Sequence, residues 1–146
     1  MLPPALFACG RVAVAGIGSP SELVDEIGSR LVLVEPSHVG EWLEHSRRAP
    51  DAHKGSVGSV LVIGGSVGKT GAAAMAAEAA LMSGTGRVTV ACARAAQPML
   101  AAGGMPEVMT EALVDDGEGI VAAAAADRIL ELANSMSVVA IGPGLG

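Results

Sequence analysis

Three continuous apolar runs, separated by helix-forming segments, constrain the fold of this chain most strongly. The strands are expected at 59–65, 87–92 and 137–146, with a short extended piece at 107–110. Helices are expected at 71–84 and 118–134, with a short one around Pro98. Apolar runs without polar alternation are typical of strands that are buried on both faces. Strands alternating with helices therefore predict an α/β fold, a parallel sheet flanked by helices.

Glycine-rich segments follow the first and the last of these predicted strands. They are GGSVGKTG, which begins at Gly64, and GPGLG, which begins at Gly142. In open parallel sheets, ligands bind beyond the carboxyl ends of the strands. Both loops are therefore expected to open on the same edge of the sheet, which makes that edge the candidate site.

The segment GGSVGKT ends like a phosphate-binding P-loop but has a different spacing. A Walker A motif requires a glycine five positions before the glycine of its GK pair. That position is Ile63, and Gly64 is one residue too close to Gly68. A P-loop NTPase is therefore rejected, although a helix that begins near Thr70 would still offer free N–H groups to a phosphate. The alternative is a plain turn between strand and helix, with Thr70 as the N-cap.

The first fifty residues follow a different pattern. Arg11–Ala15 is predicted as a short strand, and Leu31–Pro36 as a second short apolar run that is ended by proline. Between them, SPSELVDEIG predicts a short helix that Ser21 could cap. The stretch HVGEWLEHSRRAPDAH is polar, is broken by a proline, and is the best candidate for a linker. We therefore expect two parts, 1–50 and 51–146.

Charge and composition exclude several classes of partner. The 146 residues include 9 basic and 15 acidic side chains, and the basic ones are scattered. Nucleic-acid binding needs clustered Lys and Arg, so no nucleic-acid partner is expected. No apolar run reaches the ~20 residues of a membrane span, and the apolar start lacks the basic residues of a signal peptide. The two cysteines have no metal-ligand spacing, so we expect no metal site in this chain. Sparse cysteines and the lack of a membrane span or signal peptide together predict a cytoplasmic chain with no membrane partner.

Four landmarks, taken in order, resemble the ATP/ADP-dependent NAD(P)H-hydrate dehydratases, which have a ribokinase-like fold. They are HKGSVG before the first strand, GGS followed by GA at the start of an alanine-rich helix, PEVM, and GPGLG. This resemblance covers His53 to Gly146. The residues before it resemble the tail of the NAD(P)H-hydrate epimerase domain of bifunctional repair enzymes, although Gly16 stands where an aspartate is usual. The expected organisation is an epimerase tail and linker at 1–50, followed at 51–146 by the front half of a ribokinase-like dehydratase domain.

The resemblance implies a repair reaction on hydrated NADH or NADPH (NAD(P)HX). The family uses ADP or ATP to phosphorylate the hydroxyl of the hydrated ring, then eliminates phosphate and so restores NAD(P)H. Phosphoryl transfer implies Mg²⁺ as a further cofactor. The implied partner is a small-molecule dinucleotide, and the full-length enzyme is expected to be a homo-oligomer. The family's catalytic aspartate is expected beyond Gly146, so this chain is expected to contain no catalytic residue and to be inactive alone.

The resemblance also assigns residues that bind the substrate. Ala72 matches a family position that contacts the hydrated dinucleotide, and Gly144 matches a second one, with Gly142 beside it. Residues this small let a flat ring or a pyrophosphate approach the backbone. Further phosphate or pocket contacts are expected from Gly65, Ser66, Lys69, Thr70 and Glu107.

Other polar residues have a plainer interpretation. Asp115, Asp116 and Asp127 do not follow a glycine pair at a helix start, and we expect them to be solvated surface residues. His53 and Lys54 precede the first strand, where a structural role at the domain entrance is favoured. Two alternatives to the dehydratase stay open: a ribokinase-like small-molecule kinase and a non-catalytic truncated product.

Overall fold

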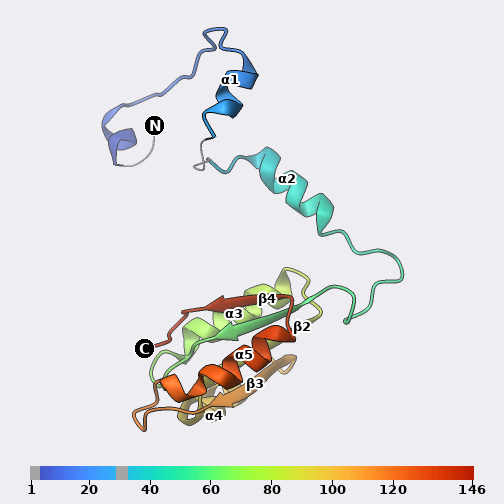
Figure 1. Ribbon diagram of the computed structural model, residues 1–146, viewed down its shortest axis with the longest axis vertical. Helices are drawn as coiled ribbons and strands as arrows, with labels where there is room; N and C mark the ends of the chain where they lie inside the picture. The colour runs from blue at the N-terminus through green and yellow to red at the C-terminus, as the bar shows by residue number, and fades with distance from the viewer. Residues whose placement is uncertain (1–3, 29–32) are drawn as a thin grey trace. The chain divides into compact units, whose positions relative to one another are not determined.

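The computed structural model describes residues 4–28 and 33–146 (Figure 1). These residues form two compact units, which divide between Leu43 and Glu44. The first unit holds the 3-10 turn η1 (Ala5–Ala8), helix α1 (Ser21–Glu26) and most of helix α2 (Pro36–His45). Every side chain described in the first unit is exposed, apart from that of half-buried His38. The described part of this unit therefore has no hydrophobic core of its own.

The second unit is built around a four-stranded parallel sheet. Its strands are β1 (Ser59–Ile63), β2 (Arg87–Ala93), β3 (Val108–Leu113) and β4 (Val138–Ile141). They are hydrogen-bonded in the order β3-β2-β1-β4, with every pair parallel. The helical segments are α3 (Thr70–Met82), η2 (Arg94–Ala96), α4 (Gln97–Gly103), η3 (Ala123–Ala125) and α5 (Ala126–Asn134). The predicted α/β class, a parallel sheet flanked by helices, is confirmed.

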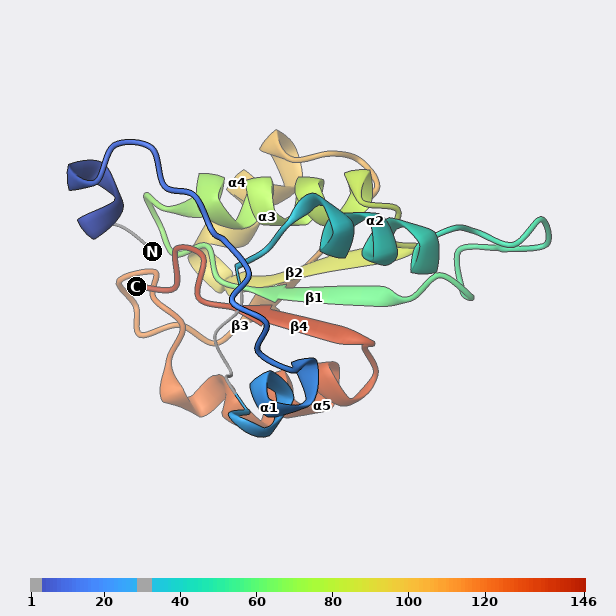
Figure 2. The same ribbon diagram turned by 90° about the horizontal axis from the view of Figure 1, so that it is seen from above.

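Alternate residues of the central strands face two different helical layers. Val62 of β1 lies in one core cluster with Ala73 and Ala77 of α3. Leu61, its neighbour along β1, belongs to the opposite cluster, against which Ile129 of α5 packs. Figure 2 shows the same arrangement, with α3 and α4 on one face of the sheet and α5 on the other. Because both faces are covered, the central strands are apolar without alternation.

Helix α3 lies close to the sheet because its buried side chains are alanines. Ala73 and Ala77 are one turn apart, and both are 0% exposed. Alanine is also the strongest helix former, so the same composition favours both the helix and its close packing. After the helix, Gly84 adopts a φ of +99°, as glycine commonly does at a helix C-terminus. Neither α3 nor any other helix among the described residues is long and apolar enough to cross a bilayer.

The segment His53–Gly58 forms a closed turn at the entrance to β1. The backbone N–H of His53 donates to Ser56 Oγ (3.0 Å), and this hydroxyl donates back to the His53 carbonyl (2.9 Å). The turn packs on Gly86, where an added Cβ would collide with the carbonyl oxygen of Lys54. These contacts give His53 and Lys54 the structural role that was predicted for them.

The predictions for the first unit are largely wrong. Arg11–Ala15 forms no strand, because no described strand in this unit can pair with its backbone groups. Ser21 does not cap α1 but is its first residue, and Pro20 takes the N-cap position without a side-chain hydrogen bond. Leu31 and Val32 lie outside the described residues, and 33–35 are not in a strand. The stretch expected to be a linker begins inside helix α2.

Two predictions for the second unit also need correction. The helix expected at 118–134 is shorter, because α5 begins only at Ala126 and the residues before it form a turn around Asp116. The last strand was expected to be buried, but Val138 and Ile141 are 55% and 63% exposed. The reason is that β4 is an edge strand, with β1 as its only neighbour among the described strands.

We predict that Gly86→Ala destabilises the second unit. The new methyl group would meet the Lys54 carbonyl, and backbone must move to admit it, at a cost of about 1–3 kcal/mol. Gly103→Ala is the matched control, since a Cβ at Gly103 meets nothing within 4 Å. Urea denaturation of both variants measures the difference, and equal midpoints would contradict the packing role of Gly86.

We also predict a loss of stability at alkaline pH that depends on Cys92. This thiol is fully buried in β2, and burial raises its pKa from 9.0 to about 11. Because the thiol ionises more readily in the unfolded chain, its contribution is complete below pH 9.0 and is lost as the pH rises towards 11. Between about pH 8 and about pH 10, the urea midpoint should therefore fall further for the wild type than for Cys92→Ala. Equal falls in the two proteins would show that the Cys92 thiol is not responsible.

Candidate functional site

The two glycine loops lie side by side at the carboxyl edge of the sheet. Gly65 N–H donates to the carbonyl of Pro143 (3.0 Å), and Ser66 N–H donates to that of Gly144 (2.6 Å). On the second loop, Gly142 N–H donates back to the carbonyl of Ile63, the last residue of β1 (3.1 Å). The expectation that both loops open on one edge is confirmed.

The first glycine loop, Gly64–Lys69, uses its N–H groups inside the protein. In addition to the bonds of Gly65 and Ser66, the N–H of Gly64 donates to the carbonyl of Ala91 in β2 (3.0 Å). The N–H of Val67 donates to the carbonyl of Gly119 (3.0 Å). A P-loop instead turns successive backbone N–H groups towards a phosphate. The four successive donors from Gly64 to Val67 are not available for that purpose, which agrees with the rejection of a Walker A motif.

Gly65 is a packing residue in this structure. Its φ is +79°, and an added Cβ would lie 3.0 Å from Leu100 and 3.1 Å from Ala73. Its N–H group is bonded to Pro143, so the backbone contact to phosphate expected from Gly65 has no donor left. The sequence pattern did not reveal this, because a glycine needed for packing looks the same as one that cradles a phosphate.

Helix α3 presents free donors beside the loop. Lys69 takes the N-cap position, Thr70 is the first helical residue, and no side chain caps the helix by a hydrogen bond. The alternative that Thr70 is the N-cap is therefore wrong. Among the described residues, nothing accepts a hydrogen bond from the N–H of Thr70 or Gly71. These donors and the positive end of the helix dipole favour an anionic group at this position.

Ser66 carries an orphaned hydroxyl at the same place. Its side chain is 2% exposed, and Oγ has no hydrogen-bond partner among the described residues. Buried polar groups are nearly always paired with protein, water or ligand. The hydroxyl therefore marks a point where the site is incomplete without a further polar group.

Ala72 and Gly144 lie on either side of the Lys69 carbonyl group. Ala72 N–H donates to this oxygen (3.3 Å), and an added Cβ at Gly144 would collide with it. Around them, an added Cβ at Gly68, Gly71 or Gly142 would meet nothing within 4 Å, so these positions border open space. The site is therefore a surface of backbone and small residues beside the start of α3.

Glu107 is not part of this surface. It directly precedes β3 and so lies at the amino edge of the sheet, opposite the glycine loops. There it lines a cavity of about 510 Å³ together with Lys54 and Arg87. The prediction that Glu107 contacts the ligand is therefore wrong, because Glu107 comes before a strand and not after one.

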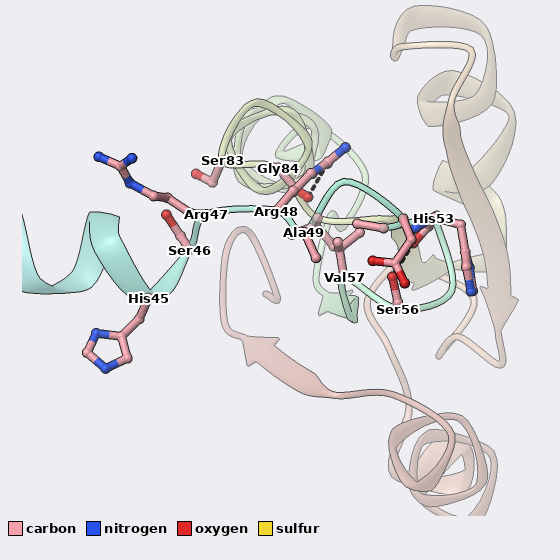
Figure 3. A pocket seen from close by; sticks show the side chains of 13 residues that line it. His45, Ser46, Arg47, Arg48, Ala49, His53, Ser56, Val57, Ser83 and Gly84 are labelled. Carbon is pink, nitrogen blue, oxygen red and sulfur yellow. Dashed lines mark hydrogen bonds between the residues drawn. The ribbon is translucent and has the colours of Figure 1, made fainter.

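A second cavity, of about 520 Å³, also lies away from the glycine loops (Figure 3). It is lined by residues around His53 that precede β1 and by Ser83–Thr85, which precede β2. Figure 3 shows Arg48 directed at Gly84, whose carbonyl accepts a hydrogen bond from its guanidinium. Arg48 thus interacts with the backbone just beyond the carboxyl end of α3.

The segment Asp115–Val121 forms a turn that sequence analysis had missed. Asp116 Oδ1 accepts the N–H groups of Glu118 (2.8 Å) and Ile120 (3.1 Å), and these bonds hold the pKa of the carboxyl below its ordinary value. Asp115 Oδ2 accepts the N–H of Ala95 (2.9 Å). Asp116 and Asp127 are exposed, as expected, and Asp115 is half-buried. The acceptor roles of Asp115 and Asp116 were not expected. The sequence DDGEG carries a signal for such a turn, because aspartate followed by glycine is typical of one.

The arrangement defines a class of protein. Solved structures of a ribokinase-like superfamily protein from Enterococcus faecalis and a hypothetical protein from Streptococcus mutans each cover 69% of this chain, with TM-scores of 0.55. They are 30% and 36% identical to it, and the chain covers 32% and 33% of them. The fold is therefore that of the ribokinase-like proteins.

A family model described as NAD(P)H-hydrate dehydratase matches residues 60–146, and the chain belongs to that family. Over 99% of its length it is 39% identical to the bifunctional NAD(P)H-hydrate repair enzyme of Moorella thermoacetica. Over 68% of its length it is 40% identical to the ADP-dependent (S)-NAD(P)H-hydrate dehydratase of Lactiplantibacillus plantarum. The chain spans 27% of the first relative and 32% of the second.

We predict that Gly144→Ala lowers the free energy of unfolding by disturbing the contact between the two glycine loops. Gly144 has a φ of +65°, and the methyl group would also collide with the Lys69 carbonyl, so a loss of about 2–4 kcal/mol is expected. Gly71→Ala serves as the control, because a Cβ there meets nothing and alanine favours the helix. Urea denaturation should show a lower midpoint for Gly144→Ala only. A Gly144→Ala protein as stable as the wild type would contradict the contact.

Proposed function

We propose that this chain supplies part of the dinucleotide site of an ADP- or ATP-dependent NAD(P)H-hydrate dehydratase. The observation that carries the proposal is the surface at the carboxyl edge, where Ala72 and Gly144 lie beside Gly142, a position that borders open space. The family match and the names of the relatives indicate hydrated NADH or NADPH as the substrate. They also favour the dehydratase over the alternative of a ribokinase-like small-molecule kinase.

In this proposal the small residues set the position of the substrate. A nicotinamide ring or a pyrophosphate can approach the backbone at Ala72 and Gly142 because no larger side chain stands there. Gly144 borders the same surface, and its missing Cβ leaves room for the Lys69 carbonyl. The N–H groups of Thr70 and Gly71, with the charge of Lys69, bind a phosphate group at the start of α3. Ser66 contributes its buried hydroxyl, which has no other partner among the described residues.

The proposed reaction has two steps, and the chain's residues bind and orient in both. ADP or ATP transfers a phosphoryl group to the hydroxyl of the hydrated ring. Phosphate then leaves with the C–O bonding electrons, a ring proton is lost, and the dihydronicotinamide is restored. Holding the dinucleotide in one orientation is the contribution that we assign to this chain.

No described residue is assigned to the chemistry itself. Asp115 and Asp116 already accept backbone N–H groups, which leaves neither of them suited to remove a proton from substrate. Among the residues that the structure describes, no cluster of three His, Cys, Asp or Glu side chains could hold a metal ion. No metal ligand is therefore assigned among these residues, and no step is assigned to the metal.

The wider organisation belongs to the same proposal. We assign 1–50 to the tail of an epimerase domain with its linker, and 51–146 to the first part of the dehydratase domain. A homo-oligomer is proposed for the full-length enzyme, and the exposed apolar side chains of β4 are the feature that supports further association.

The test is calorimetric titration of the 146-residue chain with hydrated NADPH, with NADPH as the comparison ligand. We expect selective binding that Ala72→Leu weakens by about tenfold or more, because the larger side chain covers the backbone. Ala79→Leu is the matched control, since Ala79 is exposed on α3 and lies two turns further on. Equal affinity of the Ala72→Leu variant and the wild type would contradict the assigned position of the substrate.

A further inference from the structure

The turn Asp115–Val121 is held together by the side chain of Asp116. Its Oδ1 accepts two backbone N–H groups within the turn, those of Glu118 and Ile120. The backbone of Asp116 also donates to the carbonyl of Ile120 (3.0 Å). Three hydrogen bonds therefore meet on one residue, and two of them are accepted by a single side-chain oxygen.

The turn contacts the first glycine loop through Gly119. The carbonyl of Gly119 accepts the N–H of Val67 (3.0 Å), in the middle of that loop. Gly119 is buried, has a φ of +87°, and an added Cβ would collide with the Val67 side chain. The approach of the two segments is thus close enough to require glycine.

The turn also contacts the second glycine loop. An added Cβ at Gly146 would lie 2.9 Å from Ile120 Cγ2, and Ile120 is one of the two residues whose N–H group Asp116 accepts. Asp115 fixes the other side of the turn by accepting the N–H of Ala95 in η2. One turn therefore lies against both loops of the proposed site while it is anchored to the helical segment after β2.

We propose that Asp116 is a positioning residue, which fixes the Gly64–Lys69 loop through the Gly119–Val67 hydrogen bond and so holds the start of α3 in its binding position. This inference rests on the proposed function for its effect on the dinucleotide. Asp116 does not touch the substrate surface, and its effect is transmitted by the turn. Without the carboxylate, the N–H groups of Glu118 and Ile120 lose their acceptor, and Gly119 is no longer held against Val67.

The first measurement is amide hydrogen exchange at Val67 in the 146-residue chain. We expect Asp116→Ala to accelerate this exchange by about tenfold relative to amides in the middle of β2, because a charge-assisted acceptor is lost. Glu118→Ala is the matched control: it removes the same charge from the same turn but leaves the Asp116 carboxylate in place. Asp116→Asn keeps an oxygen that can accept the two N–H groups, and should restore most of the protection.

The second measurement is the affinity for hydrated NADPH. We expect Asp116→Ala to weaken binding by about tenfold under conditions in which urea denaturation shows the variant to be fully folded, while Glu118→Ala binds as the wild type does. Val67 exchange that is the same in Asp116→Ala and the wild type would overturn the positioning role. If the wild type itself does not bind the dinucleotide, the proposed function fails, and the exchange ratio at Val67 alone decides the role of Asp116 in fixing the loop.

Discussion

Strand β1 pairs on both sides in a single register, with Leu61 opposite Thr89 of β2 and opposite Val139 of β4. Because all three strands run in one direction, the loops that leave their carboxyl ends meet at one edge. The bond from Gly65 N–H to the Pro143 carbonyl depends on that register, since a shift by one residue would separate donor and acceptor. The geometry of the candidate site is thus a consequence of the strand pairing and not of the loops alone.

The second unit achieves its packing without aromatic side chains. The two aromatics of the chain, Phe7 and Trp42, both lie in the first unit, where they are 82% and 58% exposed. The core of the second unit consists of aliphatic residues, with alanine at the contact between α3 and the sheet. The described part of this unit therefore offers no Phe, Tyr or Trp ring for stacking against a nucleotide base. In the proposed function, the small residues at positions 72 and 142 instead let a flat ligand approach the backbone.

The strands of the second unit and helix α3 could be predicted from the sequence because local composition and tertiary burial agree there. The run at 60–63 is apolar throughout, and residues 61–63 are buried between the helices of both faces. The sequence failed where tertiary contacts decide. The predicted helix does not begin at 118, because Gly119 adopts a φ of +87°, which a right-handed helix does not allow. Glu107 was grouped with the site although strand direction puts it on the other edge, and Gly65 was given a ligand contact that its bond to Pro143 excludes.

The internal use of the N–H groups of Gly64–Val67 restricts how this loop can change in evolution. One inserted residue would give GGSVGKT the spacing of a Walker A motif, and by sequence the two loops look like close neighbours. An insertion between Gly64 and Gly65 would also shift the N–H groups of Gly65, Ser66 and Val67 relative to the carbonyls that they now reach. A difference of one residue in the sequence therefore separates two loops that look alike but use their backbone N–H groups differently, one inside the protein and one towards a phosphate.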